Sequence, residues 1–409
     1  MEKTLEVAKT LTTKLANLSP KVKNSLLEKM SKDILKNKEE ILKANEKDLK
    51  EAEKNSLPEA LVERLKLDED RILDMANSIL EIAKLNEPLG RVLEGWVNSD
   101  GLRIEKVSIP IGVIGIIYES RPNVTADSAA LCIKSGNIAI LKGGKEAKHS
   151  NSIIAKTLQD SIKKFDLNPN IITLLEDRED VAKLIKQDKF VDLIIPRGGA
   201  KLIEYITKNS TVPVVKHDKG LCHIFIDKSA NFSEAVKIVK NAKCQRPGVC
   251  NALETLLIHE EIAKDILPMV YEELKKEGCE FFGCENAQKI VKISSANEDS
   301  FHTEYLSKTL NIKIVKDVNE AIYHIQKYGS GHSDSILTYD LTNAELFLNS
   351  VDSSVVYLNA STRFTDGGVF GFGAEIGIST NKLHARGPMG INDLCTYKYK
   401  IYGSGQIRE

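Results

Sequence analysis

Cys250 is the residue whose neighbours best suit covalent chemistry. It follows Pro247 and Gly248, which end the helix that precedes them, and it comes just before the apolar run 253–258, which predicts a buried strand. A side chain at such a loop-to-strand junction can be exposed while a rigid element holds it in place. Positive charge close to a thiol favours the nucleophilic thiolate, and Lys243 and Arg246 lie nearby in the sequence. The alternative is a small apolar residue at a strand edge, since cysteines without a disulfide are often buried.

Two glycine-containing turns are candidates for anion binding. Residues 141–146 read Leu-Lys-Gly-Gly-Lys-Glu and residues 195–200 read Ile-Pro-Arg-Gly-Gly-Ala, and each follows a predicted strand. Exposed backbone N–H groups and cations at the carboxyl ends of strands bind phosphates. No Gly-x-Gly-x-x-Gly pattern follows an early strand, so the usual dinucleotide fingerprint is missing. The candidate residues for a phosphate-bearing cofactor are Lys142, Gly143, Gly144, Lys145, Arg197, Gly198 and Gly199.

Composition excludes several classes of protein. The chain has 409 residues, 42% of them hydrophobic and 28% charged, with a formal net charge of −1. This balance is typical of a globular protein and argues against a nucleic-acid or membrane-surface partner. Seven cysteines without a Cys-x-x-Cys pair suggest neither a disulfide framework nor a zinc ribbon, and we expect no metal. Reduced thiols and the lack of a signal-like N-terminus or membrane span predict a cytoplasmic protein.

The elements that must position these residues form an α/β architecture. Residues 1–88 show helical spacing of apolar residues, and residues 92–109 predict a β-hairpin around the turn 98–101. From there on, short apolar strands alternate with helices, which is typical of doubly wound parallel sheets. The predicted strands are 111–118, 137–141, 171–175, 191–195, 212–215, 222–226, 254–258, 311–315, 335–338 and 354–358. Two such units in series predict a cleft between them, with Cys250 in the second.

Residues 245–252, Gln-Arg-Pro-Gly-Val-Cys-Asn-Ala, resemble the nucleophile loop of gamma-glutamyl phosphate reductases, a branch of the aldehyde dehydrogenase superfamily. The resemblance covers nearly the whole chain from about Gly90. Other matching segments are 110–124, 195–200, 332–336, 351–354, 359–368 and 382–390. It implies two doubly wound domains with a small oligomerisation element. The expected parts are 1–91 (helices of the cofactor domain), 92–109 (oligomerisation hairpin), 110–226 (NADP-binding domain), 227–363 (catalytic domain), 364–388 (return to the cofactor domain) and 389–409 (oligomerisation strand).

The resemblance also implies roles for single residues. Cys250 matches the nucleophile and Asn123 matches an asparagine that stabilises an oxyanion, although Asn after Pro is also a common turn residue. Lys142 matches a lysine that binds the adenosine ribose. Glu304 matches a carboxylate that binds the nicotinamide ribose, with an ordinary surface glutamate as the alternative. Residues in stretches that line the substrate side are His332, Asp334, Ser361, Thr362 and Arg363.

One segment departs from the wider superfamily. Hydrolytic aldehyde dehydrogenases carry a glutamate that activates water, in the motif Glu-Leu-Gly-Gly. The corresponding residues of this chain, 216–220, are Lys-His-Asp-Lys-Gly and lack that glutamate. Reduction of an acyl phosphate needs no such base, because the thiol displaces phosphate and hydride then reduces the thioacyl group. His217 remains an alternative base.

The implied activity is NADPH-dependent reduction of L-glutamyl 5-phosphate to L-glutamate 5-semialdehyde in proline biosynthesis. Lys145 lies where dehydrogenases that prefer NAD often have a glutamate, and this cation favours NADP(H). In relatives the hairpin and the C-terminal strand pair across a subunit boundary, so we expect a homo-oligomer; association with a glutamate kinase stays open. The rival readings are a hydrolytic aldehyde dehydrogenase and a non-catalytic scaffold on the same fold.

Overall fold

The chain forms two compact units in a computed structural model that describes residues 1–177, 179–215 and 219–408. The first unit comprises residues 1–216, 371–377 and 389–409, and the second comprises residues 217–370 and 378–388. Each unit has a parallel sheet with helices, which confirms the predicted α/β class. Among the described residues no helix is long and apolar enough to cross a membrane.

Five helices open the first unit, as the apolar spacing predicts. They are α1 (Glu2–Ala16), α2 (Pro20–Lys36), α3 (Lys38–Lys54), α4 (Glu59–Leu65) and α5 (Glu69–Lys84). Ser19 caps α2 by accepting a hydrogen bond from the amide of Val22 at 3.4 Å, and Pro20 occupies the first turn. The apolar stripe of α2 is fully buried, including Leu26, Met30 and other side chains of that face.

The sheet of the first unit has the strand order β5-β4-β3-β6, and all its pairs are parallel. Its strands are β3 (Val113–Tyr118), β4 (Ile138–Lys142), β5 (Ile172–Leu174) and β6 (Leu193–Arg197), and its helices are α6 (Asn123–Lys134), α7 (Lys148–Lys163), α8 (Asp180–Leu184) and α9 (Ala200–Asn209). Lys142 pairs with Ile117 and Arg197 pairs with Tyr118, so both cations lie at the carboxyl edge beside the end of β3. The predicted strand 212–215 forms only an isolated bridge between Val214 and Ile194, and Pro213 within it has no N–H to extend a ladder.

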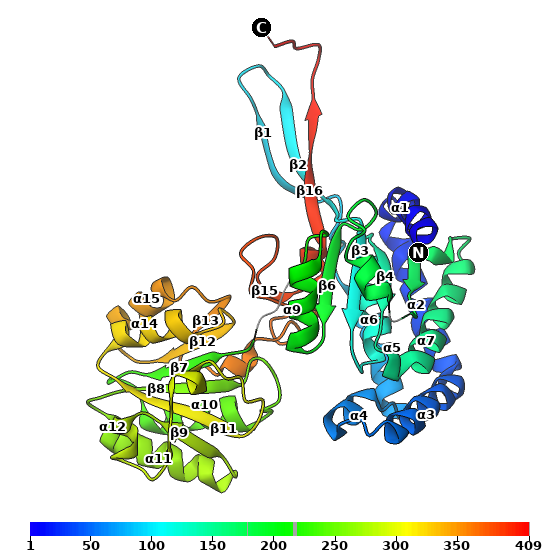
Figure 1. The fold of residues 1–409 in the computed structure, drawn as a ribbon. Coiled ribbons are helices and arrows are strands. Elements are labelled where there is room, and N and C mark those ends of the chain that lie inside the picture. Colours follow the sequence, from blue (N-terminus) through cyan, green and yellow to red (C-terminus); the bar gives the residue numbers. More distant parts are fainter. Residues whose placement is uncertain (178, 216–218, 409) are drawn as a thin grey trace. The chain divides into compact units, whose positions relative to one another are not determined.

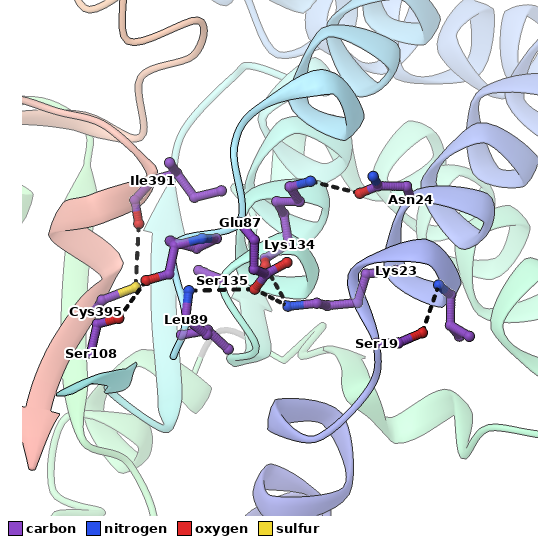
Figure 2. A network of polar contacts seen from close by, with 12 residues as sticks. Ser19, Lys23, Asn24, Glu87, Leu89, Ser108, Lys134, Ser135, Ile391 and Cys395 are labelled. Atoms are coloured by element: carbon purple, nitrogen blue, oxygen red, sulfur yellow. Dashed lines mark hydrogen bonds and ion pairs between the residues drawn. The ribbon is translucent and has the colours of Figure 1, made fainter. Parts of the chain in front are cut away.

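Two buried lysines join the N-terminal helices to α6, which packs beside this sheet (Figure 2). The Lys23 ammonium, 1% exposed, donates to Glu87 at 2.5 Å and to the carbonyl of Lys134 at 3.2 Å. The Lys134 ammonium, also 1% exposed, donates to Asn24 at 2.6 Å and to the carbonyl of Ala83 at 3.0 Å. A buried charge is costly unless it is paired and hydrogen-bonded: Lys23 has both an ion pair and a hydrogen bond, whereas Lys134 is hydrogen-bonded to two neutral oxygens.

A three-stranded antiparallel sheet extends from the first unit (Figure 1). It consists of β1 (Val92–Val97), β2 (Arg103–Pro110) and β16 (Cys395–Tyr402), with β2 in the centre. The hairpin is thus confirmed. The expected pairing of hairpin and C-terminal strand across a subunit boundary is not what is found, since β16 pairs with β2 of its own chain along its whole length.

The second unit contains a seven-stranded parallel sheet of order β10-β9-β11-β8-β7-β12-β13. Its strands are β7 (Cys222–Ile226), β8 (Leu253–His259), β9 (Glu280–Gly283), β10 (Ser294–Ser295), β11 (Thr309–Val315), β12 (Ser333–Leu337) and β13 (Val355–Leu358). Its helices are α10 (Phe232–Cys244), α11 (Ala263–Lys276), α12 (Glu285–Gln288), α13 (Glu298–Phe301), α14 (Val318–Tyr328) and α15 (Leu341–Ser350). Alternate strand residues face opposite cores: Ile224 and Leu256 pack with α10 and α11, whereas Phe225 and Leu257 pack with α14 and α15.

The chain enters the second sheet earlier than expected. β7, which the sequence-based boundaries place in 110–226, is hydrogen-bonded to β8 and β12, so it belongs to the second unit. Within 364–388, only residues 371–377 belong to the first unit. This stretch contributes β14 (Gly377–Ser379), which pairs with β15 (Gly387–Met389). Short 3-10 turns are η1 (Lys145–Ala147), η2 (Pro169–Ile171), η3 (Thr362–Phe364) and η4 (Ile391–Leu394).

Candidate active site

Cys250 lies in the loop between α10 and the central strand β8, as the sequence predicts, and its side chain is half-buried. Its peptide is fixed from two sides. A Cβ on Gly220 would fall 2.0 Å from the Cys250 carbonyl oxygen, so residue 220 can approach only because it is glycine. The thiol of Cys222 donates to the same oxygen at 3.2 Å. The thiol of Cys250 therefore projects from a backbone that cannot shift without moving β7.

The cation beside Cys250 comes from a distant part of the chain. The Nε of Arg363 donates to the Gln245 side chain at 2.9 Å, and its Nη1 donates to the side chain of Asn251. Burial and the charge of Arg246 lower the pKa of Arg363, and negative charge on Cys250 raises it. The Arg363 guanidinium thus interacts with both the thiol and Arg246, and positive charge of this kind favours a thiolate and an anionic substrate.

Lys243 does not serve the thiol as expected. Its ammonium is fully buried and forms an ion pair with Glu254 at 3.1 Å. Burial raises the pKa of Glu254 to about 7, although Lys243 and backbone N–H donors, among them Leu306 at 3.3 Å, oppose the rise. The pair ties the end of α10 to β8 on either side of the Cys250 loop.

Glu304 lies in the same unit as Cys250. Its carboxylate accepts a hydrogen bond at 2.8 Å from the amide of Gly220, the residue that packs on the Cys250 peptide. Burial raises the pKa of Glu304, and this hydrogen bond opposes the rise. Glu304 is thus connected to the nucleophile loop through one backbone contact.

The other expected substrate-side residues are mostly buried beneath that loop. His332 and Asp334 are 0% exposed; the Nδ1 of His332 contacts the Ser333 hydroxyl at 2.8 Å, and Asp334 accepts from the amide of His223 at 2.8 Å. The Thr362 hydroxyl donates to the carbonyl of Asn251 at 2.8 Å, and Ser361 caps η3 by accepting from the amide of Arg363 at 3.3 Å. Of these four residues Thr362 bonds the Cys250 loop directly. Arg363 is the one of the five whose charge interacts with the Cys250 thiol.

Asn123 lies in the first unit at the exposed start of α6. Its side-chain amide donates to the Asp127 carboxylate at 3.0 Å. The other oxygen of Asp127 is buried and has no hydrogen-bond partner among the described residues, and burial raises the pKa of this carboxyl. Asp127 fixes one N–H of Asn123 and leaves the second to point elsewhere. Sequence reasoning missed Asp127, although its spacing of four residues on one helix was an available signal.

The first predicted anion turn follows β4. Lys142 is 5% exposed and its ammonium donates to the carbonyl of Gly143 at 2.7 Å. Burial lowers the pKa of Lys142, and the negative charge of nearby carboxylates opposes this shift. A Cβ on Gly143 would lie 2.1 Å from the side-chain nitrogen of Asn151, so the glycine is required by close packing. A Cβ on Gly144 would meet the carboxylate of Glu146, while Lys145 is exposed at the start of η1.

The second predicted turn follows β6 and already holds an anionic oxygen. The amide of Gly199, at the N-terminus of α9, donates to the Glu119 carboxylate at 2.7 Å, and a Cβ on Gly198 would lie 2.7 Å from the same oxygen. The Arg197 guanidinium lies 3.9 Å from Glu375. The turn therefore has the donors and the space that a phosphate oxygen needs, with Glu119 standing in for the anion.

The contacts above include neither the alternative base His217 nor a metal site. His217, the alternative base, lies outside the described residues with Lys216 and Asp218. No group of three or more potential metal ligands is close enough to hold an ion among the residues that the structure describes.

Comparison with known proteins agrees with this geometry. The model of the aldehyde dehydrogenase family matches residues 1–279, and the chain belongs to this family of oxidoreductases. Within it, the chain is 59% identical to a gamma-glutamyl phosphate reductase of Nautilia profundicola and 61% identical to one of Nitratiruptor, in both cases over 100% of both chains. These full-length matches place it in the gamma-glutamyl phosphate reductase branch and confirm the resemblance drawn from the loop motifs.

Solved structures agree as well. A gamma-glutamyl phosphate reductase from Thermotoga maritima has a TM-score of 0.98 at 45% identity, covering 100% of this chain and 99% of the other. A glyceraldehyde-3-phosphate dehydrogenase from Methanocaldococcus jannaschii, complexed with NADP, has a TM-score of 0.68 at 17% identity, covering 98% of this chain and 94% of the other. The second match is one of fold alone.

The buried Lys243–Glu254 pair predicts a pH-dependent stability. The pKa of Glu254 in the folded chain is about 7, above its ordinary value of 4.5, so the folded chain binds this proton more tightly than the unfolded chain. The resulting stabilisation of the fold is fully present below pH 4.5 and is lost as the pH rises through 7. Between about pH 5 and 8 the free energy of unfolding of the native sequence should fall by about 2–3 kcal/mol more than that of Glu254→Gln, which has no carboxyl at this position. Urea unfolding at a series of pH values measures this. Glu69→Gln, on an exposed ion pair, is the control, and equal slopes for the native and Glu254→Gln chains would contradict the assignment.

Proposed function

We propose that this protein reduces L-glutamyl 5-phosphate with NADPH to L-glutamate 5-semialdehyde and phosphate, the second step of proline biosynthesis from glutamate. The observation that carries the proposal is the half-buried thiol of Cys250 on a fixed backbone, with the Arg363 cation beside it. The names of the full-length relatives support the same substrate. An anionic acyl phosphate suits a nucleophile that interacts with the guanidinium group of Arg363.

In the proposed reaction the Cys250 thiolate attacks the acyl carbon and forms a thioester as the C–O bond to phosphate breaks. Arg363, held by Gln245 and Asn251, offers its remaining N–H donors to an anionic group of the substrate. Arg246 adds charge that favours the thiolate and the departing phosphate. We assign the role of oxyanion donor to Asn123 on its match to the family motif, with Asp127 orienting its amide.

We further propose that the first unit binds NADP(H). When bound, this cofactor supplies the hydride that reduces the thioacyl carbon. Gly199 and the cation of Arg197 would hold phosphate oxygens where the Glu119 carboxylate now accepts. Lys142 would contact the ribose and Lys145 the 2′-phosphate, and we assign Glu304 to the nicotinamide ribose. The test is to measure NADP reduction at saturating semialdehyde with and without inorganic phosphate. Reduction that requires phosphate would exclude the hydrolytic alternative, and reduction without phosphate would favour it.

Replacement of the nucleophile tests the proposal directly. Cys250→Ser should lower turnover by at least about a thousandfold with little change in NADPH affinity, because a hydroxyl without an adjacent base is a poor nucleophile. The measurements are NADPH oxidation with L-glutamyl 5-phosphate and NADPH binding by fluorescence. Cys222→Ser is the matched control, since a hydroxyl there can still donate to the Cys250 carbonyl, and it should keep activity when folded. Substantial turnover in Cys250→Ser would remove the thiol from the mechanism.

The choice of cofactor depends on Lys145. Lys145→Glu should cost on the order of 1–3 kcal/mol of NADPH affinity, the range of hydrogen bonds to charged groups, and leave NADH affinity nearly unchanged. Lys148→Glu, exposed at the start of α7, controls for a general change of charge. Dissociation constants for both cofactors are measured on all three proteins. Equal losses for NADPH and NADH, or none, would mean that Lys145 does not contact the 2′-phosphate.

We also propose that the protein is a homo-oligomer built through the β1–β2–β16 sheet. Apolar side chains of this sheet are exposed: Val92 57%, Leu93 46%, Trp96 43%, Val97 64%, Tyr399 52% and Ile401 59%. An apolar surface on a narrow sheet of this kind is typical of an interface, here with a second copy of the chain. Light scattering at micromolar concentration should give at least twice the monomer mass, and Trp96→Asp should lower it while Tyr323→Asp does not. A monomer mass for the native chain would refute this.

A further inference from the structure

Two cysteines that take no part in the proposed reaction lie in contact beside the nucleophile loop. The sulfur atoms of Cys244 and Cys279 are 3.5 Å apart, although the residues are separated by 35 positions in the sequence. Cys244 is the last residue of α10 and is half-buried, while Cys279 precedes β9 and is 8% exposed. Both lie at the apolar core under α10 and α11. A contact of this kind is close to the geometry from which a disulfide can form.

Backbone geometry places Cys279 against the end of α10. The helix α11 ends at Lys276, and Gly278 follows with a φ of +80°, a left-handed conformation that reverses the chain. The amide of Cys279 then donates to the carbonyl of Leu274 at 3.2 Å. The contact between the two sulfur atoms is therefore set by a helix end and a tight turn, and not by two mobile loops.

The electrostatic surroundings favour Cys279 as the thiolate of this pair, which suits it to the second, resolving attack. The hydrogen bond from Cys244 is the main cause that lowers the pKa of Cys279, and the charges of Lys243 and Lys308 lower it further. The reciprocal contact raises the pKa of Cys244. One proton shared between two sulfur atoms leaves thiolate character on Cys279 while Cys244 stays accessible from solvent.

We propose that Cys244 and Cys279 are a redox modification site, which a low-molecular-weight disulfide RSSR converts reversibly into an intrachain disulfide. Cys244, after losing its proton to solvent, attacks one sulfur of RSSR, so that an S–S bond forms and the first RS⁻ leaves. The thiolate of Cys279 then attacks the Cys244 sulfur and displaces the second RS⁻. The protein dithiol loses two electrons and two protons, and RSSR becomes two RSH.

The bond would form at the base of the nucleophile loop. Cys244 is preceded by Lys243, the partner of Glu254, and followed by Gln245, which holds Arg363. The disulfide would link the end of α10 covalently to the start of β9. This modification does not depend on the proposed substrate, because neither sulfur belongs to the proposed machinery.

The test uses the full chain carrying Cys250→Ser, so that the nucleophile itself cannot react. After equilibration with oxidised glutathione, alkylation and mass spectrometry under denaturing conditions should find two fewer reactive thiols than in the reduced chain. Proteolysis should give one cross-linked peptide pair that contains Cys244 and Cys279, and dithiothreitol should restore both thiols. Recovery of both cysteines as alkylated thiols, or a cross-link between other cysteines, would overturn the proposal.

Matched variants in the same background separate the pair from general thiol reactivity. With Cys279→Ser, or with Cys279→Ala if serine is not tolerated in the core, Cys244 should retain bound glutathione and no cross-link should form. Cys284, half-buried at the same core with its sulfur accepting from the Ile314 amide, serves as the reference thiol. Cross-linking of Cys244 to Cys284 in the Cys279 variants, at a rate equal to that of the native pair, would show that the 3.5 Å contact confers no selectivity.

Discussion

The position of the reactive thiol depends on one contact between two backbones. Gly220 approaches the Cys250 peptide so closely that no side chain could fit between them, and Cys222 bonds the same carbonyl two residues later. Both residues lead into β7, which lies next to β8 in the middle of the sheet. A loop that would otherwise move is therefore fixed at its tip by a neighbouring strand. Glu304 strengthens the contact by accepting the amide of Gly220.

Carboxylates of the chain itself satisfy the donors that a cofactor would use. Glu119 accepts from Gly199, and Glu146 accepts from the amide and the hydroxyl of Ser120, each at 2.7 Å. Buried or half-buried N–H groups are costly to leave unbonded, so an internal anion stabilises the turns. If the Gly199 turn holds a cofactor phosphate as proposed, that phosphate would have to displace Glu119, and this competition would reduce the affinity for cofactor.

Local pattern was sufficient to predict most of the fold. The apolar period of α2 and the apolar runs of β3 and β8 identify these elements, because one face of the helix and both faces of the two strands are buried. The apolar residues of 212–215 predict a strand, but the segment forms only one bridge to Ile194, and Pro213 has no N–H with which to extend the pairing. Membership of β7 in the second sheet could not be predicted either, since strand pairing is decided by contacts distant in sequence.

The candidate site was predictable where a motif is continuous and not where it is assembled from distant segments. Cys250 and the glycine turns carry their signals within a few residues. The role of Arg363 beside the thiol and the pairing of Lys243 with Glu254 depend on packing, and charge near a cysteine in sequence does not say which cation faces it. Asp334 and His332 are fully buried, and their contacts with Ser333 and with His223 of the neighbouring strand could not be predicted, because they depend on strand pairing. Their place on the substrate side stays a prediction.

The second unit interrupts the first one along the chain, and this has a consequence for biosynthesis. The central strand β2 is made early, but its neighbour β16 is made only after all of the second unit. During translation one edge of β2 therefore stays unpaired until the inserted unit has been synthesised. All seven strands of the sheet of that unit precede β16 in the sequence. The second unit, which contains Cys250, can therefore form its sheet before β16 exists, and the β1–β2–β16 sheet is completed only after the second unit has been synthesised.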